Sequence, residues 1–245
     1  MKNINYTRNM KIPKIIHYCW FGKGEYPEIV KCCMSSWQKK LFDYQFIKWD
    51  EDNFDINSNT YVKEAYQAGK YAFVADYVRL YALYTCGGIY LDTDVEVLKN
   101  FDYFLTDTAF LGFEVKGALQ TAVIGSTKEH KFIQDLLGVY QNKKFIKNNG
   151  EYDLTTNVKI ITKLFLSKGL ILNGRKQNIG GFILYPQVIF APNTFSMLYS
   201  QYPKAAYVVH HFVGSWLDHK IKRETLFYKL GHYISGVLRN FLGNK

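Results

Sequence analysis

The possible folds of this chain are restricted most by one short stretch, residues 87–95, which has the sequence GGIYLDTDV. Paired glycines allow a preceding helix to end in a left-handed turn. Ile89, Tyr90 and Leu91 form a brief apolar run of the kind that occupies the interior of a sheet. Asp92 and Asp94 follow, and at strand spacing two such side chains point the same way. The stretch therefore predicts a helix end, a buried strand and two carboxylates that face one ion.

Carboxylate oxygens are ligands that suit hard cations such as Mg²⁺ or Mn²⁺, and open α/β sheets bind ligands at the carboxyl ends of their strands. Two close aspartates also mark ordinary turns, so the context matters. The helix predicted over 71–86 leads directly into the stretch and carries Asp76 and Arg79 on one face. A helix ion pair at the surface is the simpler interpretation. Because charges on an otherwise apolar helix are costly to bury without partners, we expect both to reach a site at the adjoining strand end.

The composition is that of a folded α/β protein with anionic partners. The chain has 245 residues, of which 48% are hydrophobic, enough for one large domain or two small ones. The formal net charge of +10 favours nucleotides, nucleic acid or an acidic membrane surface as partners. The abundant tyrosines and phenylalanines suit stacking on sugars or bases, but they also fill ordinary cores.

The cellular setting is predicted from what the sequence contains. Four cysteines, with no CxxC pair, indicate reduced thiols. We find no apolar core of a signal peptide near the start, and no apolar run of the roughly 18 residues that span a bilayer. We therefore expect a cytoplasmic protein, soluble or peripheral on the inner face of the cell membrane.

Apolar periodicity and turn residues predict the other elements. Strands are expected over 12–21, 44–49, 95–98, 109–114, 119–125, 182–190 (broken by Pro186) and 206–209. Helices are expected over 27–40, 62–68, 128–140 and 157–166, and an exposed loop over 143–153. Residues 220–245 form a basic amphipathic helix, the pattern of a membrane-surface segment. A terminal helix packed on the domain or on a second subunit has the same pattern.

Two aromatic residues and a histidine pair lie near predicted strand ends. Trp20 follows the first strand, where it either stacks on a nucleotide base or belongs to the core. His210 and His211 end the last strand, and a histidine there can complete a carboxylate metal site. Trp216 can donate its indole N–H to a phosphate or be a core residue.

Four segments together resemble glycosyltransferase family 32, the DXD-motif sugar transferases that include capsular-polysaccharide synthesis enzymes and yeast mannosyltransferases. The segments are IPKIIHYCWFG at 12–22, ADYVRL at 75–80, GGIYLDTD at 87–94 and HHFVGSW at 210–216. The second and third are the most specific, because they occur at close spacing. The resemblance implies a single GT-A domain over 1–218, a Rossmann-like α/β/α sandwich, followed by the basic amphipathic helix over 219–245.

The resemblance also implies roles for the residues that bind the donor, a nucleotide-sugar. Trp20 is expected to stack on the base. Asp76 and Arg79 are expected to hydrogen-bond the donor sugar. Ser215 and Trp216 are expected to lie beside the diphosphate.

A divalent cation, Mn²⁺ or Mg²⁺, is implied in the same way. Asp94 is expected to bind it directly, and Asp92 to contact the ribose, the sugar or the metal, so both are predicted to be catalytic. His211 aligns best with the strand-end metal ligand, with adjacent His210 as the alternative. A bound cation neutralises the charge of a departing diphosphate.

The expected activity is a retaining transfer of a hexose or N-acetylhexosamine from a UDP-sugar, or as second choice from GDP-mannose, to a surface glycan or lipid-linked saccharide. Direct same-face attack by the acceptor, with a phosphate oxygen as base, needs no protein nucleophile; Glu114 and Gln120 are weak candidates for one. The loop over 143–153 matches no acceptor-site pattern, so the acceptor stays open. The rival hypotheses are a metal-dependent phosphotransferase or nuclease, and a non-enzymatic basic module that binds RNA or membranes; the transferase hypothesis includes no nucleic-acid partner.

Overall fold

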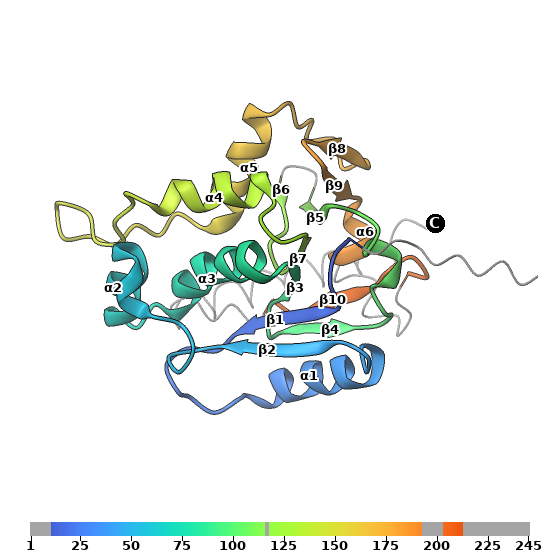
Figure 1. Cartoon of the computed structure of the whole chain (residues 1–245), viewed down its shortest axis with the longest axis horizontal. Helices are drawn as coiled ribbons and strands as arrows, with labels where there is room; N and C mark the ends of the chain where they lie inside the picture. Colours follow the sequence, from blue (N-terminus) through green and yellow to red (C-terminus); the bar gives the residue numbers. More distant parts are fainter. Residues whose placement is uncertain (1–10, 116–117, 193–202, 213–245) are drawn as a thin grey trace, which may run out of the picture.

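An eight-stranded sheet forms the centre of the protein in the computed structural model, which describes residues 11–115, 118–192 and 203–212 (Figure 1). Seven strands follow the order β2-β1-β3-β7-β5-β9-β8, and β6 pairs with β5. Their bounds are β1 Ile15–Cys19, β2 Gln45–Trp49, β3 Gly88–Leu91, β5 Ala109–Val115, β6 Ala118–Leu119, β7 Val123–Ser126, β8 Gln177–Ile179 and β9 Phe182–Tyr185. Beside it, β4 (Val95–Val97) and β10 (Val208–His210) form a separate antiparallel pair.

The first half of the sheet is parallel. Strand β1 pairs in parallel with both β2 and β3. Helix α1 (Glu28–Lys40) connects β1 to β2, and helices α2 (Thr60–Gln67) and α3 (Tyr71–Cys86) lie between β2 and β3. In Figure 1, α1 lies below this edge of the sheet and α3 above it. Because parallel strands end at the same edge, the segments after β1, β2 and β3 meet there, and Trp20 N–H donates to Trp49 O at 2.9 Å.

Helices cover both faces of the sheet and enclose two hydrophobic clusters. One cluster lies under α2, α3, α4 (Lys131–Tyr140) and α5 (Asn157–Ser167), and the other under α1, α6 (Gln187–Phe190), β4 and β10. Strand β3 shows the division, because Tyr90 belongs to the first cluster while Ile89 and Leu91 belong to the second. All four residues of β3 are buried, as the apolar run predicts. The predicted Rossmann-like α/β fold is therefore confirmed.

The two glycines after α3 are required by the backbone. Gly87 has a φ of 67° and its N–H donates to Leu83 O at 2.9 Å, which ends the helix as predicted. Gly88 has a φ of 111°, and a Cβ there would lie 2.6 Å from Ile15 O. The chain therefore turns from helix into strand in very little space, directly against β1.

Buried His17 holds this turn. Its Nε2–H donates to Gly87 O at 2.7 Å, and its Nδ1 accepts the indole N–H of Trp49 at 3.1 Å. With both ring nitrogens engaged in this way, the imidazole is neutral. Burial lowers the pKa of His17 below its ordinary value, which keeps the proton off. The histidine of the first resemblance segment is thus a structural residue that joins β1, β2 and the start of β3.

The predicted elements are present with three differences. The strand predicted over 119–125 is split into β6 and β7, because the Gln120 side chain bonds both the N–H and the carbonyl of Val123 and closes a turn. The strand predicted over 182–190 ends at Tyr185, and Pro186 precedes a short helix, α6. Strand β8 is an element that the sequence pattern did not reveal.

Several predictions concern residues that the structure does not describe. Ser215, Trp216 and the helix over 219–245 lie outside the described ranges, and so does the proposed domain boundary. Within the described residues, no helix is both long and apolar enough to cross a membrane. None of the four cysteines forms a disulfide, which agrees with the predicted reduced thiols.

Candidate metal and donor-binding site

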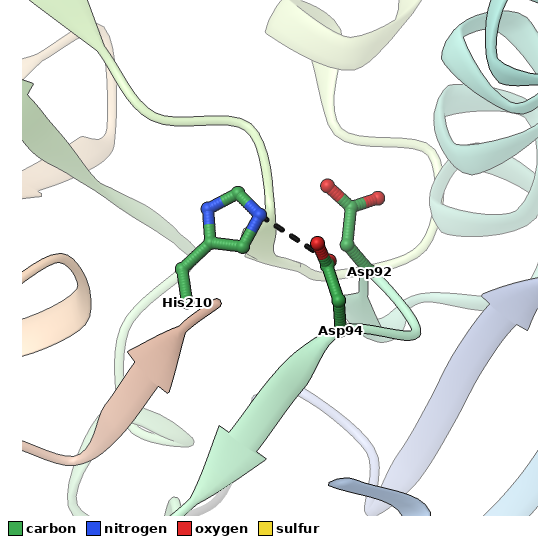
Figure 2. Close-up of side chains that lie close together, drawn as sticks. All are labelled: Asp92, Asp94 and His210. Atoms are coloured by element: carbon green, nitrogen blue, oxygen red, sulfur yellow. Dashed lines mark ion pairs between the residues drawn. The ribbon is translucent and has the colours of Figure 1, made fainter. Parts of the chain in front are cut away.

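Asp92, Asp94 and His210 converge on one point (Figure 2). One potential ligand atom from each lies within 4.8 Å of the other two, and all three residues are partly exposed. His210 Nε2 lies 3.3 Å from Asp94 Oδ1. The histidine reaches the aspartates because β10 pairs with β4, which places His210 opposite Val95. The pairing of these two short strands thus brings together residues that are far apart in the sequence.

The two aspartates occupy a turn and not a strand, which corrects the sequence-based interpretation. Strand β3 ends at Leu91, and the carbonyl of Asp92 accepts the N–H of Val95 at 3.1 Å. The carbonyl of Asp94 accepts the N–H of His211 at 3.0 Å, which ties the turn to the end of β10. The carboxylates converge through this turn and not through the alternation of side chains along a strand.

The histidine beside the aspartates is His210, whereas the family resemblance favoured His211. His211 Nε2 lies 3.1 Å from Glu96 Oε2 instead. Neighbouring residues at a strand end point to opposite sides, so only one of the two can face Asp94. Burial by itself would lower the pKa of His210, but the hydrogen bond and charge of Asp94 outweigh it and raise that pKa above its ordinary value.

Arg79 contacts both Asp76, the other residue predicted to bind the donor sugar, and Asp92 of this cluster. Its Nη2 lies 3.0 Å from Asp76 Oδ1, and its Nη1 lies 3.3 Å from Asp92 Oδ1. Nη1 also donates to Thr121 O at 2.9 Å, and Nε donates to Ala75 O at 3.1 Å. Burial would lower the pKa of Arg79, but the two carboxylates raise it above its ordinary value, so the side chain is a permanent cation. Asp76 and Arg79 therefore share a face and reach the strand end, as expected.

Asp76 is also tied to the start of helix α5. Its Oδ2 accepts the backbone N–H of Asn157 at 3.2 Å, and its carbonyl accepts the side-chain amide of the same residue at 3.3 Å. Burial raises the pKa of Asp76 to about 6, against the opposing effect of Arg79. Its carboxylate is thus engaged by two protein partners and contributes to positioning α5 next to α3.

Trp20 lies where the prediction puts it in the fold, directly after β1. Its indole N–H donates to Gly24 O at 2.7 Å, and its ring lies 4.6 Å from the ring of Tyr26. The side chain is partly exposed and so is not a core residue. This arrangement leaves an aromatic surface at the carboxyl edge of the sheet, where a base can stack.

The two weak candidates for a nucleophile have different environments. Gln120 is buried, and its amide is consumed by the hydrogen bonds to Val123 that close the β6–β7 turn. Glu114 is partly buried in β5 and lies close enough to His210 for its charge to raise the pKa of the histidine. Gln120 is therefore a structural residue, and Glu114 belongs to the wider surroundings of the cluster.

Tyr90 is a site residue that sequence reasoning missed. Its hydroxyl donates to Asp92 Oδ1 at 2.8 Å, and its ring lies under the Arg79 guanidinium at 4.5 Å. The signal was present, because Tyr90 and Asp92 are two residues apart and the apolar run of β3 is interrupted only by this polar hydroxyl. The apolar run by itself indicates only a core role for Tyr90.

The donor set fits a divalent cation. Two carboxylates and one imidazole offer the oxygen and nitrogen atoms that Mn²⁺ accepts, and Mg²⁺ prefers the carboxylates among them. Partial exposure leaves room for water or a diphosphate to complete the coordination. The carboxylate of Asp92 is already held by Tyr90 and Arg79, the kind of outer support that metal ligands usually have.

Comparisons with known proteins show what the chain is similar to. Residues 27–111 match the family described as "Glycosyltransferase sugar-binding region containing DXD motif". The chain is 32% identical over 165 residues to inositol phosphoceramide mannosyltransferase 3 of Schizosaccharomyces pombe. That match covers 66% of this chain and 45% of the relative, so the chain spans less than half of the relative's length.

Two solved structures of glycosyltransferases are also partly similar to the chain. The PaToxG glycosyltransferase has a TM-score of 0.48 and 19% identity, covering 64% of this chain and 69% of that one. A glycosyltransferase involved in the glycosylation of the major capsid of PBCV-1 has a TM-score of 0.47 and 12% identity, covering 82% and 95%.

The family match spans the sheet edge from α1 to β5 and includes Asp76, Arg79, Asp92 and Asp94. These are the residues that the fold brings together at the end of β3. Residues 27–111 of the chain therefore match the DXD-containing sugar-binding region of glycosyltransferases, and the four residues gathered at the end of β3 lie within that match.

Proposed function

We propose that this protein transfers a hexose from a nucleotide-sugar donor, with a divalent cation held by Asp92, Asp94 and His210. The observation that carries the proposal is the convergence of these three side chains within 4.8 Å at the carboxyl end of β3. Open α/β sheets bind nucleotides at this edge. The family match supports the sugar-transfer chemistry, and the donor set supports the cation.

The cation and the cluster have separate tasks. When bound, a divalent cation neutralises the charge that develops on a diphosphate leaving group. Asp94 and His210 would hold it from one side and Asp92 from the other. Trp20 would stack on the base of the donor. Side chains fixed in this way before the reaction lower the barrier without reorganising during it.

The stereochemical outcome that we propose is retention, by attack of the acceptor on the face from which the diphosphate leaves. In this route a phosphate oxygen of the donor takes the proton of the acceptor hydroxyl. Of the two weak candidates for a nucleophile, Gln120 has its amide bonded to Val123, and Glu114 is partly buried in β5 near His210. No protein nucleophile is needed.

The donor is proposed to be a nucleotide-activated hexose, with GDP-mannose as the first to test and UDP-hexoses as the second. The yeast relative is named a mannosyltransferase, which reverses the order of preference that the sequence alone suggested. The relative's name also includes a phosphate-bearing lipid acceptor. An acceptor carried on an anionic lipid is consistent with the formal net charge of +10 and with a location at the inner membrane surface.

The test is release of nucleoside diphosphate from GDP-mannose, UDP-glucose, UDP-galactose and UDP-N-acetylglucosamine, with Mn²⁺ or with EDTA. Many transferases hydrolyse their donor slowly without an acceptor, so the assay does not need the acceptor to be known. We expect release from one donor that stops with EDTA and falls at least 100-fold in Asp94→Ala, because removing a group that stabilises the leaving charge costs about 10²–10³ in rate.

Asp135→Ala is the matched control, since Asp135 lies in α4 and its partners are Lys131 and Lys168, neither of which belongs to the site. It should keep wild-type release. Full activity in EDTA would refute the cation-dependent mechanism. Cleavage of nucleic acid without any release from nucleotide-sugars would favour the nuclease hypothesis instead.

A further inference from the structure

We infer that Tyr90 and Arg79 are positioning residues that hold one carboxylate oxygen of Asp92 and so keep its other oxygen ready for the cation. This inference rests on the proposed function and gives Arg79 a task toward Asp92 that is separate from any contact with the donor sugar. Neither residue is a ligand of the cation in this arrangement. They act through Asp92.

The first observation is that two donors meet on a single oxygen. Asp92 Oδ1 accepts the Tyr90 hydroxyl at 2.8 Å and lies 3.3 Å from Arg79 Nη1. A carboxylate whose one oxygen accepts a hydrogen bond and also pairs with a buried guanidinium cannot rotate freely. The second oxygen is left to bind whatever occupies the space between Asp92, Asp94 and His210.

The second observation is that Arg79 is occupied by the protein. Nε, Nη1 and Nη2 all have partners, namely the carbonyls of Ala75 and Thr121 and the carboxylates of Asp76 and Asp92. Two of these four contacts are hydrogen bonds to backbone carbonyls, and the other two are ion pairs with carboxylates. Its Cζ lies over the Tyr90 ring, 4.5 Å from the ring centroid. A guanidinium with partners at all three nitrogens and an aromatic ring beside it is fixed in place.

The third observation is the difference in exposure. Tyr90 is 2% exposed and Arg79 is 5% exposed, whereas the side chain of Asp92 is 25% exposed. Only the aspartate is therefore accessible to a ligand. The tyrosine hydroxyl and the guanidinium lie beneath it, where they can act on the site only by orienting the carboxylate.

Thr121 connects the same arginine to the neighbouring strand. Its carbonyl accepts Arg79 Nη1, and the carbonyl of Ala122 accepts the N–H of Asp92 at 2.9 Å. Arg79 thus binds both the Asp92 carboxylate and the segment before β7 that holds the Asp92 backbone. One side chain fixes the aspartate from two directions.

The experiment measures Mn²⁺ binding directly, by the loss of the free-ion signal in electron paramagnetic resonance, for the full chain and for Tyr90→Phe. The phenylalanine keeps the ring under Arg79 and removes only the hydroxyl. We expect Mn²⁺ to bind about 10-fold more weakly, since outer partners of metal ligands typically contribute 10–100-fold to affinity.

Tyr185→Phe is the matched control, because the Tyr185 hydroxyl donates to Asp107 Oδ2 at the same 2.8 Å, away from the cluster. It should bind Mn²⁺ as the wild type does. Arg79→Lys is the second variant. It should also weaken Mn²⁺ binding, measured in the absence of any nucleotide-sugar.

Two outcomes would overturn the inference. If the affinity of Tyr90→Phe for Mn²⁺ lies within twofold of the wild-type affinity, the Tyr90 hydroxyl does not position Asp92. If Arg79→Lys bound Mn²⁺ with unchanged affinity, Arg79 would not position Asp92. A wild-type protein that binds no Mn²⁺ would instead refute the proposed cation site, and the inference with it.

Discussion

Replacing His17 by leucine tests how the fold holds the start of β3. The side chain is fully buried and makes two hydrogen bonds, to Gly87 O at 2.7 Å and from the Trp49 indole at 3.1 Å. Leucine has a similar size but no polar atom, so the carbonyl and the indole N–H both lose their partners. Each buried group left unpaired costs about 1–3 kcal/mol. We therefore expect the free energy of unfolding to fall by about 2–6 kcal/mol.

Equilibrium unfolding in urea, followed by circular dichroism, measures this loss, and a double-mutant cycle with Trp49→Phe separates its parts. Each single variant leaves one end of the indole–imidazole bond unpaired, whereas the double variant removes both ends. The double variant should therefore lose roughly 2 kcal/mol less than the sum of the single losses. If the two single losses add up to the loss of the double variant within about 0.5 kcal/mol, the hydrogen bond between His17 and Trp49 is refuted.

The pH dependence gives a second check on the same residue. Burial holds the pKa of His17 below its ordinary value of 6.5. Just below pH 6.5, the histidine is therefore protonated in the unfolded chain but still neutral in the folded protein. The stability that neutral His17 contributes is present above pH 6.5 and is lost as the pH falls below that value. The leucine variant lacks this titration, while all other groups are shared. The difference in stability between the two proteins should shrink from pH 7 to pH 5, and a difference that grows would refute the assignment.

Other substitutions test single features of the fold by the same unfolding measurement. Gly88→Ala should destabilise by at least about 2 kcal/mol, because a Cβ would lie 2.6 Å from Ile15 O at a φ of 111°. Gly138→Ala, in open space on α4, should instead stabilise by up to about 1 kcal/mol; equal effects of the two changes would contradict this. Trp37→Phe should cost at least about 2 kcal/mol, because Val95 O loses the indole N–H at 2.7 Å. A cost below about 0.5 kcal/mol would show that this bond does not hold β4.

The sequence predicted best the elements whose conformation depends on their own residues and not on contacts with distant segments. Helix α3 spans Tyr71–Cys86 as expected, because its apolar periodicity is long and the glycines that follow can only end it. The buried strand β3 follows for the same reason. Asp76 and Arg79 share a face because helix geometry alone puts them there.

What the sequence could not predict depends on contacts between distant segments. The choice between His210 and His211 is made by the register of β10 on β4, which no local pattern contains. The Gln120 side chain closes the turn between β6 and β7 by bonding the backbone of Val123. Apolar residues on both sides of this turn give the sequence the pattern of one continuous strand. The aspartates were expected in a strand, yet the bond from Val95 N–H to Asp92 O turns the chain between them.

The structural positions of Tyr90 and Arg79 show the same limit. The sequence indicates that an arginine and two aspartates belong to one site. It does not indicate that the arginine lies beneath the carboxylate, because this depends on how α3 packs on β3 and β7. Asp76 and Arg79, which the sequence predicted to contact the donor sugar, form an ion pair with each other. Arg79 also contacts Asp92 and the carbonyl of Thr121.

The central claim is that Asp94 and His210 together hold a divalent cation, and Mn²⁺ binding to His210→Ala and His211→Ala tests it most directly. The two histidines are neighbours, and each lies beside a carboxylate, at 3.3 Å and 3.1 Å respectively. Only His210 faces the two aspartates. We predict that His210→Ala weakens Mn²⁺ binding by at least about 10-fold while His211→Ala binds it like the wild type. Unchanged binding by His210→Ala, or a loss confined to His211→Ala, would contradict the account.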